Sequence, residues 1–256
     1  MSDLEIALDE GALWLTLNRP EQLNALTGEM VIALVEELRG AVARDDVRLV
    51  VLTGAGPAFS AGADLGGNNA QENYDAASVD GANMLIRAIT ELDKPVVCAL
   101  NGIAAGVGMS VALACDLVVA TESAALTLAF TKIGLMPDGG ATATVAASVG
   151  RAKAMRLALL SDLLSAQEAY DAGLVSHVFP DDGYAAALAK IVARLSRGAP
   201  LAFAATKKAV NAATLGELGG AFQRERAGQS LLLRTDDAAE GMKAFAEKRR
   251  PEFNGH

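Results

Sequence analysis

Two segments of this chain share one design, in which a short apolar run is followed by a loop of very small residues. Residues 50–54 (VVLTG) lead to 59–65 (FSAGADL), and residues 95–100 (PVVCAL) lead to 101–108 (NGIAAGVG). Each apolar run predicts a buried strand. Small residues let backbone N–H groups face a ligand without side chains in the way. The repeated pattern therefore favours an α/β fold that carries two backbone-lined loops.

These loops suit the stabilisation of an oxyanion. Two backbone N–H groups aimed at one oxygen form an oxyanion hole, and each donor in a dry site lowers the barrier by about 3–4 kcal/mol. The second loop also opens a predicted helix, whose N-terminal end favours negative charge. Tight turns are the alternative for either loop taken alone. Neither loop fits a dinucleotide fingerprint, because Phe59 and Val111 stand where the third glycine belongs.

The rest of the chain alternates strand, turn and helix signals. Apolar residues alternate with polar ones over 4–17, which predicts a hairpin, and residues 66–80 read as a polar loop. Helical patterns prevail from residue 139 onward, apart from a strand predicted over 173–179. The sequence therefore predicts an α/β core over 1–198 and a helical C-terminal region over 199–256.

Composition excludes several classes of protein. The net charge of −9 argues against a nucleic-acid binder, because such proteins gain affinity by neutralising phosphates. The first residues are acidic and do not form a signal peptide, and no run approaches the roughly 18 apolar residues of a membrane span. Cys98 and Cys115 lie in apolar segments, as reduced buried thiols do. We therefore expect a soluble cytoplasmic protein.

Five segments, in order along nearly the whole chain, resemble the crotonase family of enoyl-CoA hydratases and isomerases. The two small-residue loops are the most specific of them. The others are the N-terminal LNRP with NAL (17–20, 24–26), SAQEA leading to GLV (165–169, 173–175), and EGMKAF with EKR (240–245, 247–249).

The resemblance implies a spiral of ββα units whose C-terminal helices assemble a homotrimer or a dimer of trimers. It implies an acyl-CoA thioester substrate and no metal or redox cofactor. The backbone N–H groups of Ala63 and Val107 would hold the thioester oxygen. Val107 replaces the family's commonest glycine, which a backbone donor tolerates if φ is negative. The expected substrate contacts are Ala61, Asp64, Leu65, Gly106, Gly108, Ser110 and Phe130, with Asp64 also a candidate for structural turn bonds.

The resemblance also bears on the reaction. Hydratases of the family use two glutamates to activate water, and the corresponding positions here carry Ser110 and Phe130. Neither side chain is a general acid or base near neutral pH. Hydration by the usual two-carboxylate route is therefore not expected.

One carboxylate remains in this neighbourhood. Residues 130–140 (FTKIGLMPDGG) are similar to family members that move double bonds or rearrange ring-containing acyl-CoAs, and Asp138 matches their catalytic aspartate. Apolar neighbours such as Leu135 and Met136 would raise the pKa of such a carboxylate. The alternative is that Asp138 is a helix N-cap or a turn residue after Pro137.

Three functions follow from these observations. The first is a cofactor-free isomerase in which Asp138 shuttles a proton while Ala63 and Val107 hold the enolate. The second is a hydratase with an atypical site. The third is a non-catalytic acyl-CoA-binding protein. The acyl group itself is not predicted by the sequence.

Overall fold

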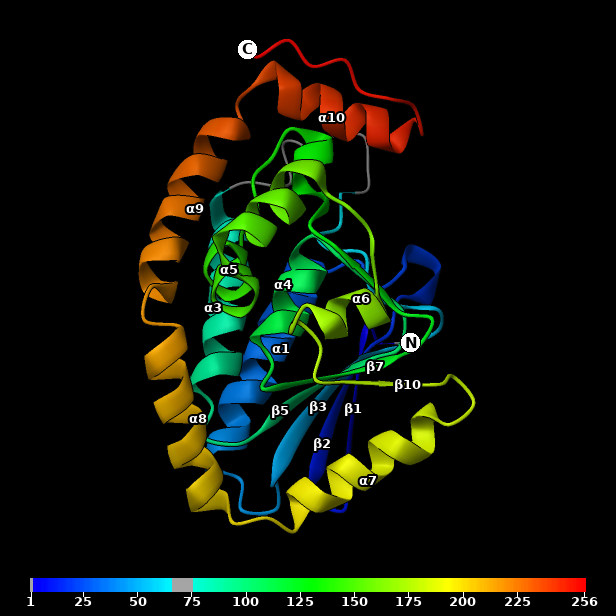
Figure 1. The fold of residues 1–256 in the computed structure, drawn as a ribbon, viewed down its shortest axis with the longest axis vertical. Helices are drawn as coiled ribbons and strands as arrows, with labels where there is room; N and C mark the ends of the chain where they lie inside the picture. Colours follow the sequence, from blue (N-terminus) through cyan, green and yellow to red (C-terminus); the bar gives the residue numbers. More distant parts are fainter. Residues whose placement is uncertain (1, 66–75) are drawn as a thin grey trace.

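The computed structural model describes residues 2–65 and 76–256, and its centre is a six-stranded sheet with helices on both faces (Figure 1). The first two strands form the predicted antiparallel hairpin, and every later strand joins in parallel. The strands in spatial order are β1 (Leu4–Asp9), β2 (Ala12–Leu17), β3 (Leu49–Gly54), β5 (Val96–Leu100), β7 (Leu117–Thr121) and β10 (His177–Phe179).

Both faces of this sheet are buried, which is why its central strands read as continuous apolar runs. In β3, Leu49 and Val51 pack toward α7, whereas Val50 and Leu52 belong to the larger core beneath α1, α3 and α4. Successive side chains of a strand point to opposite faces, so one run of apolar residues serves both layers.

A second, four-stranded sheet positions the two small-residue loops. Its strands in spatial order are β4 (Ala58–Ser60), β6 (Ile103–Ala105), β8 (Ala125–Thr127) and β9 (Leu164–Ser165). Strands β4 and β6 are parallel neighbours, so the loops that follow their carboxyl ends lie side by side. The sequence predicted a turn throughout 101–108, but residues 103–105 are a strand because they pair with β4 and β8.

The helices cover the sheets and then extend as a C-terminal arm. Figure 1 shows α8 and α9 following one another along one side of the molecule, with α10 across one end. Short 3-10 helices lie at Pro20–Gln22, Ala41–Ala43 and Ala129–Ile133 (η3). The α-helices are α1 (Gly28–Gly40), α3 (Ala76–Glu91), α4 (Val107–Ala114), α5 (Ala141–Leu160), α6 (Ala166–Asp171), α7 (Tyr184–Ser196), α8 (Pro200–Thr214), α9 (Leu218–Leu232) and α10 (Asp236–Ala246).

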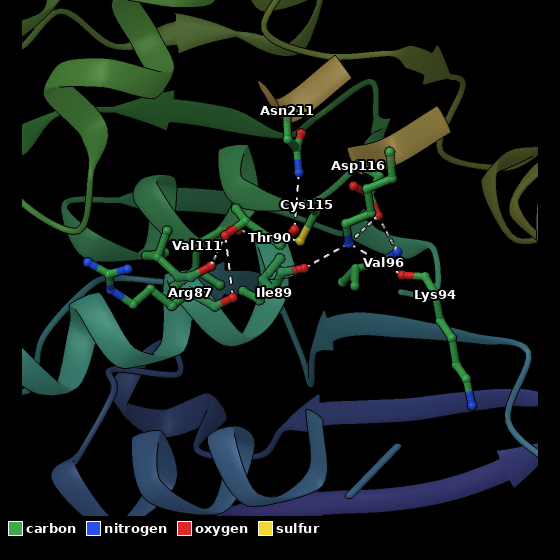
Figure 2. A network of polar contacts seen from close by, with 11 residues as sticks. Arg87, Ile89, Thr90, Lys94, Val96, Val111, Cys115, Asp116 and Asn211 are labelled. Carbon is green, nitrogen blue, oxygen red and sulfur yellow. Dashed lines mark hydrogen bonds and ion pairs between the residues drawn. The ribbon is translucent and has the colours of Figure 1, made fainter. Parts of the chain in front are cut away.

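Polar contacts attach α8 to the core, as Figure 2 shows. The amide of Asn211 donates to the Thr90 carbonyl, and Asp116 accepts from the Val96 N–H. The ammonium of Lys207 lies 2.9 Å from the Asp116 carboxylate and also donates to the Ile89 carbonyl. These contacts explain how a helix with no fully buried side chain stays docked.

The predicted α/β class is confirmed, and several local predictions need correction. The polar loop predicted over 66–80 is wrong for residues 76–80, which begin α3, while 66–75 lie outside the described residues. The strand predicted over 173–179 is confirmed only for His177–Phe179. The division at residue 198 stays a prediction. Within the described ranges, no helix is both long and apolar enough to cross a membrane.

Candidate active site

The first small-residue loop follows β4 and is fixed by the segment that precedes α1. Ala63 pairs with Leu26 in an isolated parallel bridge. The Leu26 N–H donates to the Gly62 carbonyl at 2.8 Å, and the Asp64 N–H donates to the Leu26 carbonyl at 3.0 Å. In extended backbone the intervening N–H points to the opposite side. The Ala63 N–H therefore points away from Leu26, and no acceptor for it is found within residues 2–65 and 76–256.

The second loop follows β6 and starts a helix. Gly106 has a φ of 53°, a conformation that favours glycine, and Val107 is the first residue of α4. Val107 does not have a positive φ, so it meets the condition under which valine can replace glycine as a backbone donor. The N–H groups of a first helical turn have no intrahelical acceptor. In the described part of the chain, no hydrogen-bond acceptor is found for the Val107 N–H outside the helix.

The two loops are in contact. A Cβ built on Gly62 would lie 2.8 Å from the Ala105 oxygen and 3.5 Å from the Val107 nitrogen. A side chain at position 62 would therefore push the loops apart. Glycine at position 62 therefore allows the two loops, which carry Ala63 and Val107, to approach closely.

Two cavities meet at this pair, since Ala63 and Val107 line both of them. We call the first the loop cavity; it is mostly apolar and lies between the two loops, η3 and α10, with Phe130, Lys132 and Phe245 in its wall. The second, the helix cavity, lies against α1 and α3 and has a volume of about 490 Å³. That volume falls in the usual range for a small-molecule site.

Asp138 lies in the loop between η3 and α5 and is fully buried. Its main-chain carbonyl accepts a 2.8 Å hydrogen bond from the Ser110 hydroxyl on α4. A Cβ on the next residue, Gly139, would stand 3.5 Å from Cγ2 of Val107. The loop of Asp138 is thus packed against the first turns of α4. Asp138 is not the N-cap of α5, because the N-cap is Gly140, but the other alternative holds: the Ala141 N–H donates to the Asp138 carbonyl at 3.3 Å, so Asp138 begins a turn.

Two side chains of α9, one turn apart, form hydrogen bonds with the loop that carries Asp138. Glu225 is fully buried and accepts from the Gly140 N–H at 2.7 Å and from the N–H and hydroxyl of Thr142. Gln229 is also fully buried; its Nε2 donates to Asp138 Oδ2 at 2.8 Å, and its Oε1 accepts from the Met136 N–H. The C-terminal arm therefore contributes directly to the candidate site.

The structure separates the predicted site residues into two groups. Ala61, Ala63, Leu65, Gly106, Val107 and Phe130 line the loop cavity, and Asp64 joins Ala63 and Val107 around the helix cavity. Asp64 also forms a 2.8 Å ion pair with Arg19.

Three predicted residues, Gly108, Ser110 and Asp138, line neither cavity. Gly108 packs on β4, where a Cβ would come within 2.6 Å of the Ser60 oxygen. Ser110 is fully buried, and its hydroxyl donates a hydrogen bond to the main-chain carbonyl of Asp138. These two residues therefore support the site from within, and the catalytic role of Asp138 stays a prediction.

Sequence reasoning missed Glu225, Gln229 and Phe245. A usable signal was present: Phe222, Glu225 and Gln229 recur at helical spacing, so two polar side chains share a face with a buried aromatic residue. Phe245 lies on α10, which packs closely on η3 at Gly241, where a Cβ would be 2.4 Å from the Ile133 carbonyl carbon. No local pattern indicated that α10 would reach the loop cavity.

Similarity to known proteins extends over this whole arrangement. A sequence profile of the family described as Enoyl-CoA hydratase/isomerase matches residues 8–256. The chain is 39% identical to the 1,2-epoxyphenylacetyl-CoA isomerase of Escherichia coli (strain K12), with 97% of each chain covered. It is 37% identical to the 2,3-dehydroadipyl-CoA hydratase of the same strain, with 100% of each covered. A crystal structure of an enoyl-CoA hydratase from Mycobacterium avium subsp. paratuberculosis K-10 has a TM-score of 0.93 at 47% identity, covering 99% of both chains.

Proposed function

This chain belongs to the enoyl-CoA hydratase/isomerase family, and we propose that it is an acyl-CoA isomerase that works through an enolate. The observation that carries the proposal is the packing of the buried Asp138 loop against α4, directly behind the wall that contains the Ala63 and Val107 donors. The 1,2-epoxyphenylacetyl-CoA isomerase among its relatives supports this choice of reaction class.

In the proposed reaction the Ala63 and Val107 N–H groups donate to the thioester oxygen of the substrate. Negative charge grows on that oxygen as the enolate forms, and fixed donors stabilise the charge without having to reorganise. The first turn of α4 adds its positive end at the same place. The apolar wall of the loop cavity excludes water and strengthens these interactions.

Asp138 is proposed to move the proton. With a 3-enoyl thioester, its carboxylate removes a proton from C2, and the C2 electron pair delocalises into a dienolate. The protonated Asp138 then returns the proton to C4, so the double bond moves to C2–C3 and the carboxylate is regenerated. The cycle is balanced and needs no metal or cofactor beyond the CoA of the substrate. One general base suffices for such a shuttle.

Hydration is the second candidate, because relatives named as hydratases are comparably similar to this chain. It requires a second acid or base to activate water. Ser110 donates to the Asp138 carbonyl, and the buried carboxylate of Glu225 accepts from Gly140 and Thr142. Because both side chains already form these hydrogen bonds, neither is placed to activate water, which favours the isomerase over the hydratase.

We also propose that the chain assembles into a homotrimer or a dimer of trimers. Large apolar side chains near the end of α5 are exposed, with Leu159 at 61%, Leu160 at 64% and Leu163 at 60%. These leucines lie within five positions of one another in the sequence, and clusters of exposed apolar side chains mark interaction sites. Sedimentation analysis of the purified protein tests the assembly.

The test of the reaction uses two substrates, a straight-chain 3-enoyl-CoA and the matching 2-enoyl-CoA. Ultraviolet absorbance of the conjugated enoyl thioester follows both. Absorbance that rises from the 3-enoyl thioester, and fails to rise with Asp138→Asn, supports the isomerase. Absorbance that falls from the 2-enoyl thioester supports hydration. Binding of both without any product supports a non-catalytic acyl-CoA-binding protein.

A further inference from the structure

The contact between Gln229 and Asp138 joins residues 91 positions apart in the sequence. Gln229 lies on α9, and neither its side chain nor that of Asp138 is exposed to solvent. The Nε2–Oδ2 distance is 2.8 Å and the distance from the Met136 nitrogen to Oε1 is 3.1 Å. One amide therefore spans two points of the loop that carries the proposed base.

The orientation of this amide follows from hydrogen-bond chemistry. The backbone N–H of Met136 can only donate, so the oxygen of Gln229 must face it. That leaves the NH₂ group, which can only donate, facing Asp138. The amide cannot flip without placing a donor against a donor at one end and oxygen against a carboxylate at the other. Asp138 Oδ2 thus always meets a neutral N–H donor.

We propose that Gln229 is a positioning residue for the base of the isomerase: it fixes the rotation of the Asp138 carboxylate by holding Oδ2 and favours the ionised form that accepts the substrate proton. The inference rests on the proposed function. A neutral donor supports a carboxylate with one hydrogen bond and adds no opposite charge. The carboxylate can then gain and lose a proton during the cycle more easily than it could beside a cation.

The titratable side chains on the elements around Asp138 include Glu225, Arg226, Arg87 and Lys132. On α9, Glu225 is engaged by Gly140 and Thr142, and Arg226 pairs at the surface with Asp80 of α3. On α3, Arg87 lies over the Phe222 ring, 4.8 Å from its centroid. Helix α4 and residues 141–150 of α5 contain no titratable side chain. Lys132 lies in the wall of the loop cavity.

The test is Gln229→Glu, which keeps the oxygen that accepts from Met136 and replaces only the NH₂ that faces Asp138. Two carboxylates in contact cannot both ionise readily, so the pair retains a proton. We expect kcat at pH 7 to fall at least about tenfold, with KM changed less than about threefold. The acidic limb of the kcat–pH profile should move to higher pH by at least about one unit, so that activity recovers at alkaline pH.

A matched control is Gln167→Glu on α6. The Gln167 amide also donates to an aspartate, Asp171, at 2.9 Å, but it does so at the exposed surface. The same chemical change is expected there to leave kcat and the pH profile unaltered. Where Gln229→Glu does not fold, Gln229→Met removes the donor without adding charge, and a smaller shift of the acidic limb in the same direction is expected.

Asp138→Asn, measured in parallel, separates this inference from the proposed function. If Asp138→Asn turns over normally, the proposed function is wrong whatever Gln229 does. If Asp138→Asn is inactive while Gln229→Glu keeps the wild-type kcat and pH profile, the inference about Gln229 is overturned. The assignment of Asp138 as the general base is then retained. Activity lost equally at every pH, together with a lowered Tm, would also overturn it, since that is a structural role.

Discussion

Two aspartates near opposite ends of α4 are each held by a side chain from the C-terminal arm, but the two partners differ. Asp138, near the first turns of α4, is fully buried and accepts from the neutral amide of Gln229. Asp116, just beyond the other end, has a side chain that is 22% exposed and meets the ammonium of Lys207 (Figure 2 shows its region). An ammonium neutralises a carboxylate and anchors a helix, whereas an amide orients a carboxylate and adds no opposite charge of its own.

The difference separates a candidate reaction centre from a structural joint. Around Asp116, Lys207 and Asn211 tie α8 to main-chain carbonyls at the end of α3, and Asp116 itself accepts from the Val96 N–H at the start of β5. Around Asp138, the contacts fix the loop, and the nearby first turn of α4 carries the backbone N–H of Val107, which has no acceptor among residues 2–65 and 76–256. Proton-transfer chemistry is therefore expected at only one end of the helix.

The largest expected effect is a contrast in turnover between two matched substitutions. We expect Asp138→Asn to lower kcat by about 10³-fold, because a general base contributes about 10²–10⁴-fold. Asp116→Asn should leave kcat within about twofold of wild type. The ultraviolet assay with a 3-enoyl-CoA measures both. A comparable loss of kcat in a folded Asp116→Asn protein would remove the distinction between the two ends.

The second prediction concerns stability at the joint. Lys207→Gln leaves the carboxylate of Asp116 without its cation, and Asp116→Asn leaves the ammonium without its anion. Breaking a largely buried pair from one side should cost about 2–4 kcal/mol. The double variant Asp116→Asn/Lys207→Gln should cost less than the sum of the two, because two neutral amides are not charges in need of partners. Urea denaturation of the four proteins measures the coupling, and strict additivity would contradict it.

The third prediction uses pH to detect the same joint. Desolvation raises the pKa of Asp116 above its ordinary value of 3.8, although Lys207 pulls it downward. A carboxyl with a raised pKa favours the folded state most below its ordinary pKa, and this contribution is lost as pH rises through the folded pKa. The free energy of unfolding of wild type minus that of Asp116→Asn should therefore decrease as pH rises from the ordinary pKa of 3.8 through the raised pKa of Asp116 in the folded protein. A difference that is flat or rises with pH would contradict this reading.

The smallest effect is expected at an exposed ion pair on the C-terminal arm. Hydrogen bonds from Arg249 and from the Glu252 N–H lower the pKa of Glu240 to about 2. The stabilisation is present above the ordinary pKa of 4.5 and is lost as pH falls through about 2. Glu240→Gln should therefore change Tm by only about 1 °C, while hydrogen exchange in residues 249–256 speeds up. Unchanged exchange in that segment would mean that the pair does not hold it.

Local sequence patterns predicted much of the fold and part of the candidate site. The hairpin and the two strand-to-loop passages depend on neighbouring residues, and the structure confirms them. Strand β9 was not predicted, because two residues carry no periodicity of their own. Residues 76–80 were predicted as loop, because the five residues AASVD show little periodicity of their own at the start of α3.

The residues suited to the proposed chemistry can be identified from the order of amino acids alone: small residues beside the two donors, and one aspartate after Pro137 in place of paired glutamates. The partners that hold that aspartate become visible only in the folded chain. The Ser110 hydroxyl donates a hydrogen bond to the Asp138 carbonyl. The Gln229 amide, 91 residues away in the sequence, donates to the Asp138 carboxylate. Such partners depend on how helices pack across the core, and helical periodicity identifies a buried face without saying which loop that face will meet.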